Sequence, residues 1–305
     1  MSKQLATDQR SDGFVLVTKN KRKPRNSVKR TTKPADFQPD RDDKSPIDVD
    51  LFLRCFNETQ YDLKSSEYLK NTVGKVLPVL GTVKLERIVC LGLGKVTECP
   101  ISRHQLAFIR CLQEKLSFDG TIEYFDPVFC EQTIVILEKL GGVVSRENYE
   151  GKYSADVATL FYLPHCPKQI SNNLLWKNWN SQLLKNVFLI GNSFAGIVEN
   201  CPKRLLQKTG HFILEVEDFC REIPFDNTFR HKDIFNDTSF HYFDNSVARE
   251  KPTKFWNLIE EPQYTDEDLE LITRNIQKGL IISDNGNNKG NEQNIEEASH
   301  RIESH

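Results

Sequence analysis

The chain alternates short apolar runs with stretches of helical periodicity, and this alternation limits its possible folds more than any other feature. The first run, Arg87–Leu91, is apolar after its arginine and ends in Gly92-Leu93-Gly94, as expected for a strand buried on both faces. Ser102–Leu116 follows with leucines and isoleucine at helical spacing. Strands that alternate with helices of about 10 to 15 residues imply crossover connections and a parallel sheet. The sequence therefore predicts an α/β, Rossmann-like fold with helices on both faces.

Four more apolar runs bring the predicted parallel sheet to about five strands. Each is bounded by turn-forming or helical sequence, which is the usual setting of a strand in this class of fold. The additional strands are expected at Ile122–Phe125, Val143–Val144, Val157–Leu163 and Val187–Ile190.

Helices are expected between these strands and ahead of them. Apolar residues within Ile47–Leu80 recur at helical spacing, which indicates an amphipathic helix that covers one side of the domain. Another helix passes through Ile134 and Leu137 and stops at Gly141, and a third is expected over Leu174–Leu184. Phe212–Val216 is expected to add an edge strand.

The two ends of the chain differ from its middle. Hydrophobic residues make up only 38% of the sequence, and the polar, charged and Asn-rich segments that lower this share lie at the ends. We expect a disordered basic arm over residues 1–45, an α/β domain over 46–245, and a polar tail over 246–305 with one peripheral helix at Thr265–Leu280.

Charge is nearly balanced overall but clustered near the N-terminus. The formal net charge is −2, so no global field favours nucleic acid or an acidic membrane. Lys19–Lys33 contains eight basic residues and no acid. This run is either a nuclear-import or nucleic-acid patch or a solvated arm, and any nucleic-acid contact is expected only there.

The chain has no apolar stretch of about 18 residues and no apolar core of a signal peptide at its start. Its eight cysteines are spread singly, without a Cys-x-x-Cys pair. They are expected to be reduced thiols rather than a disulfide framework or a structural zinc site. We therefore expect no membrane contact and a cytoplasmic protein that also enters the nucleus if the basic run directs import.

Candidate ligand-binding residues gather where the predicted strands end. Ligands of open parallel sheets bind at the carboxyl ends of the strands, where the strand order reverses. Each such residue alone could equally be a turn former, a cap or a core side chain. The residues at these strand ends are Gly92, Gly94, Asp126, Pro164, His165, Gly191, Asn192 and Ser193.

The start of the helix after the first strand offers a further anion-binding feature. Ser102, Arg103 and Gln105 lie in its first turn or two, where free backbone N–H groups and a guanidinium suit a phosphate or carboxylate. The dinucleotide fingerprint is incomplete, because its third glycine is missing and Asp126 comes later than the acid that binds the ribose. Alternatively, Ser102 caps the helix and Arg103 pairs with a surface acid.

Three of the cysteines precede a proline, whereas composition alone predicts about 0.3 such pairs. They are Cys99, Cys166 and Cys201. The Cys-Pro pair resembles the haem-regulatory motif, in which a thiolate ligates iron and proline keeps the sulfur on a turn. The alternative is three ordinary loop cysteines. Haem is therefore a candidate cofactor, and the sequence does not otherwise identify one.

Four blocks in fixed order carry a resemblance to a known family. They are Ser102–Ala107, Asp126–Phe129, Thr159–Cys166 and Ile190–Phe194. Together they resemble the sensitivity to red light reduced (SRR-like) family over about Leu51–Phe243. The sequence departs from the family's pattern at Leu163, where methionine is frequent, and at Phe14, where tryptophan is frequent.

The resemblance implies a regulatory protein with roles in circadian clock input, light signalling and control of haem biosynthesis, and it supplies no catalytic residues. We therefore expect a regulator, with protein partners that the sequence does not identify, whose crevice binds a small anionic ligand or haem. Two alternatives stay open. One is a nucleotide- or S-adenosylmethionine-using enzyme with Asp126 on a ribose, and the other is an interaction module without a ligand.

Overall fold

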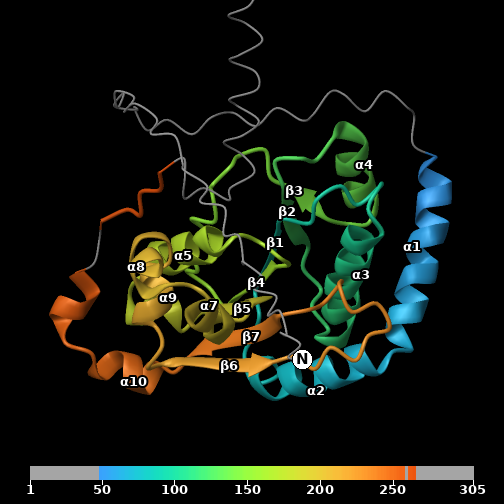
Figure 1. Cartoon of the computed structure of the whole chain (residues 1–305). Coiled ribbons are helices and arrows are strands. Elements are labelled where there is room, and N and C mark those ends of the chain that lie inside the picture. The colour runs from blue at the N-terminus through green and yellow to red at the C-terminus, as the bar shows by residue number, and fades with distance from the viewer. Residues whose placement is uncertain (1–47, 258–259, 266–305) are drawn as a thin grey trace, which may run out of the picture. The chain divides into compact units, whose positions relative to one another are not determined.

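The computed structural model describes residues 48–257 and 260–265, and these form a seven-stranded sheet with helices on both faces (Figure 1). The strand order is β3-β2-β1-β4-β5-β7-β6. The first five strands pair in parallel, whereas β7 is antiparallel to both β5 and β6. The strands are β1 (Arg87–Leu91), β2 (Ile122–Phe125), β3 (Val143–Val144), β4 (Thr159–Leu163), β5 (Val187–Asn192), β6 (Cys220–Pro224) and β7 (Thr238–Phe243).

This architecture confirms the predicted Rossmann-like fold, with the five predicted strands in place. The order 3-2-1-4-5 is that of a doubly wound sheet, whose direction of growth reverses between β1 and β4. The antiparallel strands β6 and β7 were not predicted, and they extend the sheet beyond β5.

After their first residues, the central strands β1 and β4 are apolar because both of their faces are covered. In β1, Ile88 and Cys90 face a first hydrophobic core, while Val89 and Leu91 face a second one. Successive side chains of a strand point to opposite faces, so a strand packed on both sides needs apolar residues at every position. The two cores lie on the two sides of the sheet.

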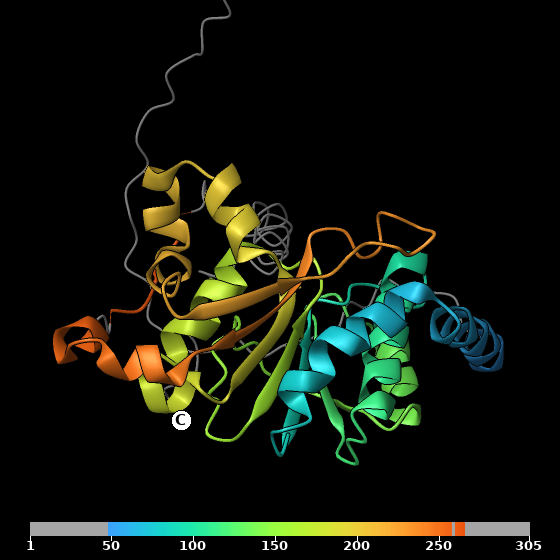
Figure 2. The same cartoon turned by 90° about the horizontal axis from the view of Figure 1, so that it is seen from below.

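Four helices cover one face of the sheet and build the first core (Figure 2). Tyr162 and Phe240 belong to the same core. The single helix predicted within Ile47–Leu80 is in fact two helices. They separate where the Ser66 hydroxyl accepts a hydrogen bond from the backbone N–H of Leu69 at 3.2 Å and so caps a new helix. The helices are α1 (Val49–Lys64), α2 (Glu67–Leu80), α3 (Pro100–Lys115) and α4 (Glu131–Lys139).

The opposite face is covered by shorter helices, which pack on the second core or border it. The helix predicted over Leu174–Leu184 is divided at Asn178, and the edge strand predicted at Phe212–Val216 is wrong. That segment belongs to a short helix and its C-cap Val216, and Phe212, Ile213 and Val216 are buried. The helices are α5 (Lys168–Lys177), α6 (Ser181–Leu184), α7 (Phe194–Asn200), α8 (Lys203–Thr209), α9 (His211–Glu215) and α10 (Asn245–Glu250).

Asn178 interrupts the helical run because its side chain bonds to a neighbouring loop. Its Oδ1 accepts the backbone N–H of Ala155 at 2.7 Å, and its Nδ2 donates to the carbonyl of Tyr153 at 2.8 Å. Asn178 is fully buried, so these bonds satisfy polar groups that no water reaches. The amide thereby fixes the loop that enters β4 against the end of α5.

The chain continues to pack on the second core after β7. Residues Thr253–Asn257 form a 3-10 turn that follows α10. Its Phe255 and Trp256 rings lie 5.1 and 5.4 Å from the ring of Trp179, and the Trp179 indole donates to the carbonyl of Phe255. The predicted arm, its basic run Lys19–Lys33 and, apart from Thr265, the predicted helix Thr265–Leu280 lie outside the described residues. None of the described helices combines the length and apolarity that crossing a membrane requires.

Candidate functional site

Most of the sequence-predicted site residues lie at the carboxyl ends of the parallel strands. Gly92 follows β1, Asp126 follows β2, His165 follows β4, and Asn192 ends β5. Strand order reverses between β1 and β4, so this rim includes the switch point at which doubly wound folds bind ligands. The side chains on the rim divide into two groups, one that is buried in structural contacts and one that lines a pocket.

The switch point itself is filled by the side chain of Cys166. Its thiol donates to the carbonyl of Leu91 at 3.3 Å. Gly92 has a φ of +74°, and a Cβ on it would lie 2.3 Å from the Cys166 sulfur. Burial raises the pKa of Cys166, so the thiol stays protonated and keeps its role as a donor. A ligand that entered between β1 and β4 would first have to displace this thiol.

Asp126 is also engaged in contacts within the rim. It is 2% exposed, and its two oxygens accept the backbone N–H groups of Gly94 at 2.7 Å and Val128 at 2.9 Å. Burial raises the pKa of this carboxyl, while the two hydrogen bonds oppose the rise. Asp126 therefore ties the end of β2 to the glycine loop after β1, and both of its oxygens are already used.

The first turns of α3 carry the candidate anion-binding side chains. Cys99 is the N-cap of this helix, and Ser102 is buried behind it. Burial raises the Cys99 pKa, but hydrogen bonds from Ser102 and Ile101 and the charge of Arg103 outweigh it and leave the pKa lowered. Cys99 therefore lies at the N-terminus of α3, in surroundings that favour the charged form of its thiol.

Gln105 reaches from α3 toward β4. Its Nε2 donates to the carbonyl of Ile234 at 3.2 Å and lies 3.4 Å from Nδ1 of His165. The other ring nitrogen, Nε2, lies 3.3 Å from the carbonyl of Asn236. The Gln105 amide nitrogen can only donate and the Asn236 carbonyl can only accept, so Nδ1 is the acceptor of the ring and Nε2 its donor. These partners hold His165 in a left-handed backbone conformation with a φ of 51°.

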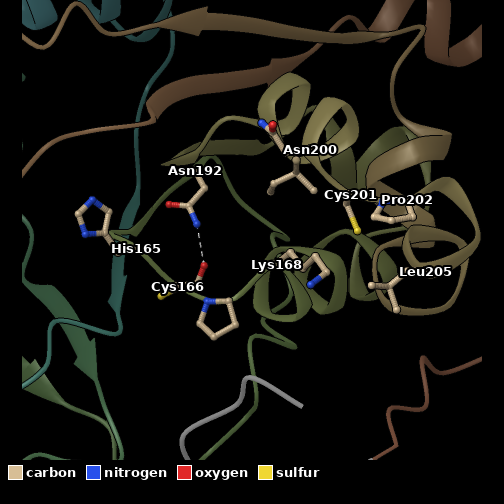
Figure 3. Close-up of a pocket in the computed structure, with 10 residues that line it drawn as sticks. His165, Cys166, Lys168, Asn192, Asn200, Cys201, Pro202 and Leu205 are labelled. Atoms are coloured by element: carbon tan, nitrogen blue, oxygen red, sulfur yellow. Dashed lines mark hydrogen bonds between the residues drawn. The ribbon is translucent and has the colours of Figure 1, made fainter. Parts of the chain in front are cut away.

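A pocket of about 490 Å³ opens beside this histidine, over the ends of β4 and β5 (Figure 3). In the view of Figure 3, His165 lies on one side, and Cys201 and Leu205 lie on the other. The Asn192 amide crosses between the two strand ends and donates to the carbonyl of Cys166 at 2.9 Å. The lining residues are His165, Cys166, Pro167, Lys168, Asn192, Ile197, Asn200, Cys201, Pro202 and Leu205.

The structure thus brings His165, Cys166, Asn192 and Cys201 together in this pocket. The other predicted residues lie outside its lining. Among them, Pro164 is buried at the end of β4, and Gly191 pairs with Leu163 across the sheet. Those outside the lining are Gly92, Gly94, Cys99, Ser102, Arg103, Gln105, Asp126, Pro164, Gly191 and Ser193.

Ser193 belongs to a network that the sequence did not reveal. It caps α7 by accepting the N–H of Gly196 at 2.9 Å, and the neighbouring Ala195 N–H donates to the carboxylate of Glu222 in β6 at 2.9 Å. The same carboxylate oxygen lies 3.6 Å from Nε2 of His241, which is fully buried in β7. Burial raises the Glu222 pKa, but hydrogen bonds from His241 and Ser193 lower it to about 2.

This network fixes the start of α7, one wall of the pocket, from the antiparallel strands. Its residues could have been suspected only from a histidine between aromatic residues at Phe240 and Tyr242. Within residues 48–257 and 260–265, no group of three or more His, Cys, Asp or Glu side chains is arranged to hold a metal ion.

The chain is therefore a Rossmann-like α/β protein with a filled switch point and a pocket beside it, and comparisons with known proteins agree on its family. The SRR1 domain matches residues 67–242, which include all four blocks noted in the sequence. The chain is 31% identical to the SRR1-like protein of Drosophila melanogaster over 265 residues. This aligned stretch covers 86% of this chain and 93% of the relative. The chain belongs to the SRR1 family.

Two further relatives agree with this assignment. The SRR1-like protein of Mus musculus is 39% identical over 143 residues, which are 46% of this chain and 57% of the mouse protein. The Arabidopsis thaliana protein named SENSITIVITY TO RED LIGHT REDUCED 1 is 27% identical over 232 residues, 71% of this chain and 81% of the plant protein.

Proposed function

We propose that this protein is a regulator in light or clock signalling that responds to a small anionic ligand bound in the pocket over β4 and β5. The name of the Arabidopsis relative refers to red-light sensitivity, which supports the signalling role. The observation that carries the ligand proposal is the pocket lining: among its described residues Lys168 is the charged one, and none is an aspartate or glutamate. The positive charge of Lys168 favours an anion at this end of the pocket.

The lining also indicates which chemical groups the ligand carries. Lys168 begins α5, a helix of ten residues whose N-terminus carries positive partial charge, so an anionic group would bind at this end. Ile197 and Leu205 supply apolar surface on α7 and α8. The ligand is therefore a small molecule with a carboxylate or phosphate group and an apolar portion.

The contacts of the switch point favour binding over nucleotide chemistry. A dinucleotide or S-adenosylmethionine would need free backbone donors in the glycine loop and a free acid for its ribose. The N–H of Gly94 is bonded to Asp126, and the thiol of Cys166 stands between β1 and β4. We therefore place regulation ahead of the enzyme alternative.

The ligand proposal is tested by thermal shift on the full chain with a panel of carboxylates and phosphate esters. Binding should raise the stability by about 2.7 kcal/mol at a hundredfold excess over Kd. Leu205→Trp should fill the pocket and abolish the shift, whereas Leu77→Trp is the matched control, because the two leucines are 38% and 37% exposed. A panel without any shift, or an equal shift in both variants, contradicts the proposal.

Haem is the specific ligand that would connect this pocket to control of haem biosynthesis, and Cys201 is its best candidate thiol. Cys201 lines the pocket and is half-buried, whereas the Cys166 thiol is buried and donates to a carbonyl. Cys99 lies at the start of α3, outside the pocket lining. Haem bound through a thiolate should shift the Soret band of added haem in the wild type and in Cys99→Ala. Loss of that shift in Cys201→Ala supports the assignment, and an unchanged shift refutes it.

We also propose that the protein divides between cytoplasm and nucleus through the basic run Lys19–Lys33. A tagged full-length protein should lose nuclear signal when the basic residues of this run are replaced by glutamine. An unchanged nuclear fraction would leave the run as a solvated arm.

A further inference from the structure

Helix α5 buries a row of amide side chains in addition to the leucines that it packs into the second core. Gln169, Asn172 and Asn173 are 0%, 1% and 0% exposed. Their spacing of three and four residues places them on one face of the helix. A buried amide is stable only when its donor and acceptor atoms have partners, so the partners of this row define what it recognises.

The two asparagines each use one end of the amide to hold the fold together. Asn172 accepts the backbone N–H of Phe212 through Oδ1 at 2.8 Å. Asn173 donates from Nδ2 to the carbonyl of Glu150 at 2.7 Å. These bonds fix both amides, so that their other ends, Asn172 Nδ2 and Asn173 Oδ1, stand in a set orientation.

Those other ends meet at a single hydroxyl group, that of Tyr264. Asn172 Nδ2 donates to the phenolic oxygen at 3.0 Å, and the hydroxyl donates to Asn173 Oδ1 at 2.8 Å. The carbonyl of Gln169 lies 3.4 Å from the same oxygen. The site thus offers the hydroxyl one donor and two acceptors, and the single phenolic proton makes its shorter bond to Asn173 Oδ1.

A second anchor lies three residues before this tyrosine. Glu261 forms an ion pair with Lys152, which also pairs with Glu150 at 3.0 Å. Burial lowers the Lys152 pKa, but the hydrogen bonds that its amine donates to Glu261 and Glu150 outweigh this effect and leave the pKa raised, so the amine stays protonated. Residues 260–265 have no helix or strand of their own, so the segment is held through side chains.

We propose that the α5 amides and Lys152 form a docking site for an extended segment with a carboxylate followed three residues later by a tyrosine, which the chain's own residues 260–265 occupy as a displaceable latch. The latch is displaceable because its anchors are polar, and water can replace a hydroxyl or a carboxylate at each of them. A partner protein with the same Glu-x-x-Tyr pattern would then bind α5 in its place.

The latch sets a threshold for such a partner. Phe255 and Trp256 pack against Trp179 just before the latch, so the segment stays tethered beside its site. A short tether gives an effective concentration in the millimolar range, which a free segment must exceed in affinity. Opening the latch should therefore increase the apparent affinity for an external segment.

The chemistry of the hydroxyl gives the site a built-in selectivity. Phosphorylation of Tyr264 would remove the proton donated to Asn173 Oδ1 and set anionic oxygens against that atom and against the carbonyl of Gln169. The site is thus specific for unmodified tyrosine, and a phosphorylated segment should be rejected.

The test measures fluorescence anisotropy of a labelled peptide with the sequence of residues 260–265, added to the full chain. The chain carrying Glu261→Ala and Tyr264→Phe has an open latch, and it should bind the peptide at least about tenfold more tightly than the wild type does. Gln263→Ala, an exposed change in the same segment, is the control and should match the wild type. No binding to the open-latch chain, or equal binding to the wild type, overturns the proposal.

Two peptide variants make the result specific. The phosphotyrosine peptide should bind the open-latch chain at least about tenfold more weakly than the unmodified one. Adding Lys152→Glu to the open-latch chain should weaken the unmodified peptide, and a peptide with lysine in place of Glu261 should restore binding. Equal affinity of the phosphopeptide, or failure of this charge swap, refutes the assignment even if some peptide binding occurs.

Discussion

Replacing Gly92 with alanine tests whether the Cys166 thiol fills the switch point of the sheet. The new methyl group would meet the sulfur at 2.3 Å, and the residue would have to keep a φ of +74°. The left-handed conformation costs an alanine about 1 to 2 kcal/mol. Overpacking of a filled site costs about 1 to 3 kcal/mol more. We therefore expect Gly92→Ala to lower the free energy of unfolding by about 2 to 5 kcal/mol.

Two further variants separate these costs. Gly141 has a similar φ of +79°, but a Cβ on it would meet no atom within 4 Å. Gly141→Ala should therefore lower the free energy of unfolding only by the cost of the left-handed backbone conformation, about 1 to 2 kcal/mol. In a Cys166→Ala background the sulfur is absent, so the cost of Gly92→Ala should fall to nearly that of Gly141→Ala. The resulting coupling energy between Gly92 and Cys166 is about 1 to 3 kcal/mol.

Urea unfolding followed by circular dichroism gives the free energy for all variants. The slope with denaturant must stay constant for the energies to be compared. If Gly92→Ala costs no more than Gly141→Ala, or if Cys166→Ala leaves the cost of Gly92→Ala unchanged, the thiol does not fill the crevice. The switch point would then be open to a ligand.

Three other predictions follow from the contacts and pKa shifts described above. The Glu222 pKa is lowered from 4.5 to about 2 in the folded state, so Glu222→Gln should lower the free energy of unfolding by about 2 kcal/mol at pH 7. This difference between the variant and the wild type should shrink as the pH of the measurement falls from about 4.5 toward 2. Asn178→Ala leaves a buried N–H without a partner and should cost about 2 to 4 kcal/mol in urea unfolding, whereas loss of the exposed cap in Asn180→Ala should cost about 1 kcal/mol. Iodoacetamide at pH 7 should modify Cys99, whose pKa is lowered, before Cys166, whose pKa is raised, as seen by mass spectrometry of peptides; the reverse order would contradict the assigned environments.

The parallel part of the fold could be predicted because each of its strands is a local apolar run. The antiparallel part could not. In β6, Arg221 and Glu222 interrupt any apolar pattern, and in β7 a buried histidine stands where an apolar residue would have marked the strand. Phe212–Val216 was assigned to a strand because five residues are too few to distinguish the two periods. Its buried positions show the helical spacing only once the structure is known.

The rim could be predicted from the strand ends, but the division of its residues could not. Sequence places Asp126 and His165 on the same rim equally well. Only coordinates show that Asp126 uses both oxygens on backbone N–H groups while His165 borders a pocket. The hydrogen-bond partners of His165 are Gln105 and Asn236, which lie 60 and 71 residues away in the chain. A local sequence pattern cannot predict contacts between residues so far apart in the sequence.

The two outermost strands of the sheet have a consequence for how copies of this protein behave at high concentration. An edge strand exposes unpaired backbone groups that invite another chain to extend the sheet. At one margin β3 offers only two residues, and at the other β6 carries charges at Arg221 and Glu222 and ends in Pro224, which has no N–H to donate. Neither margin is a good template for intermolecular strand addition, which protects the folded domain from edge-to-edge aggregation.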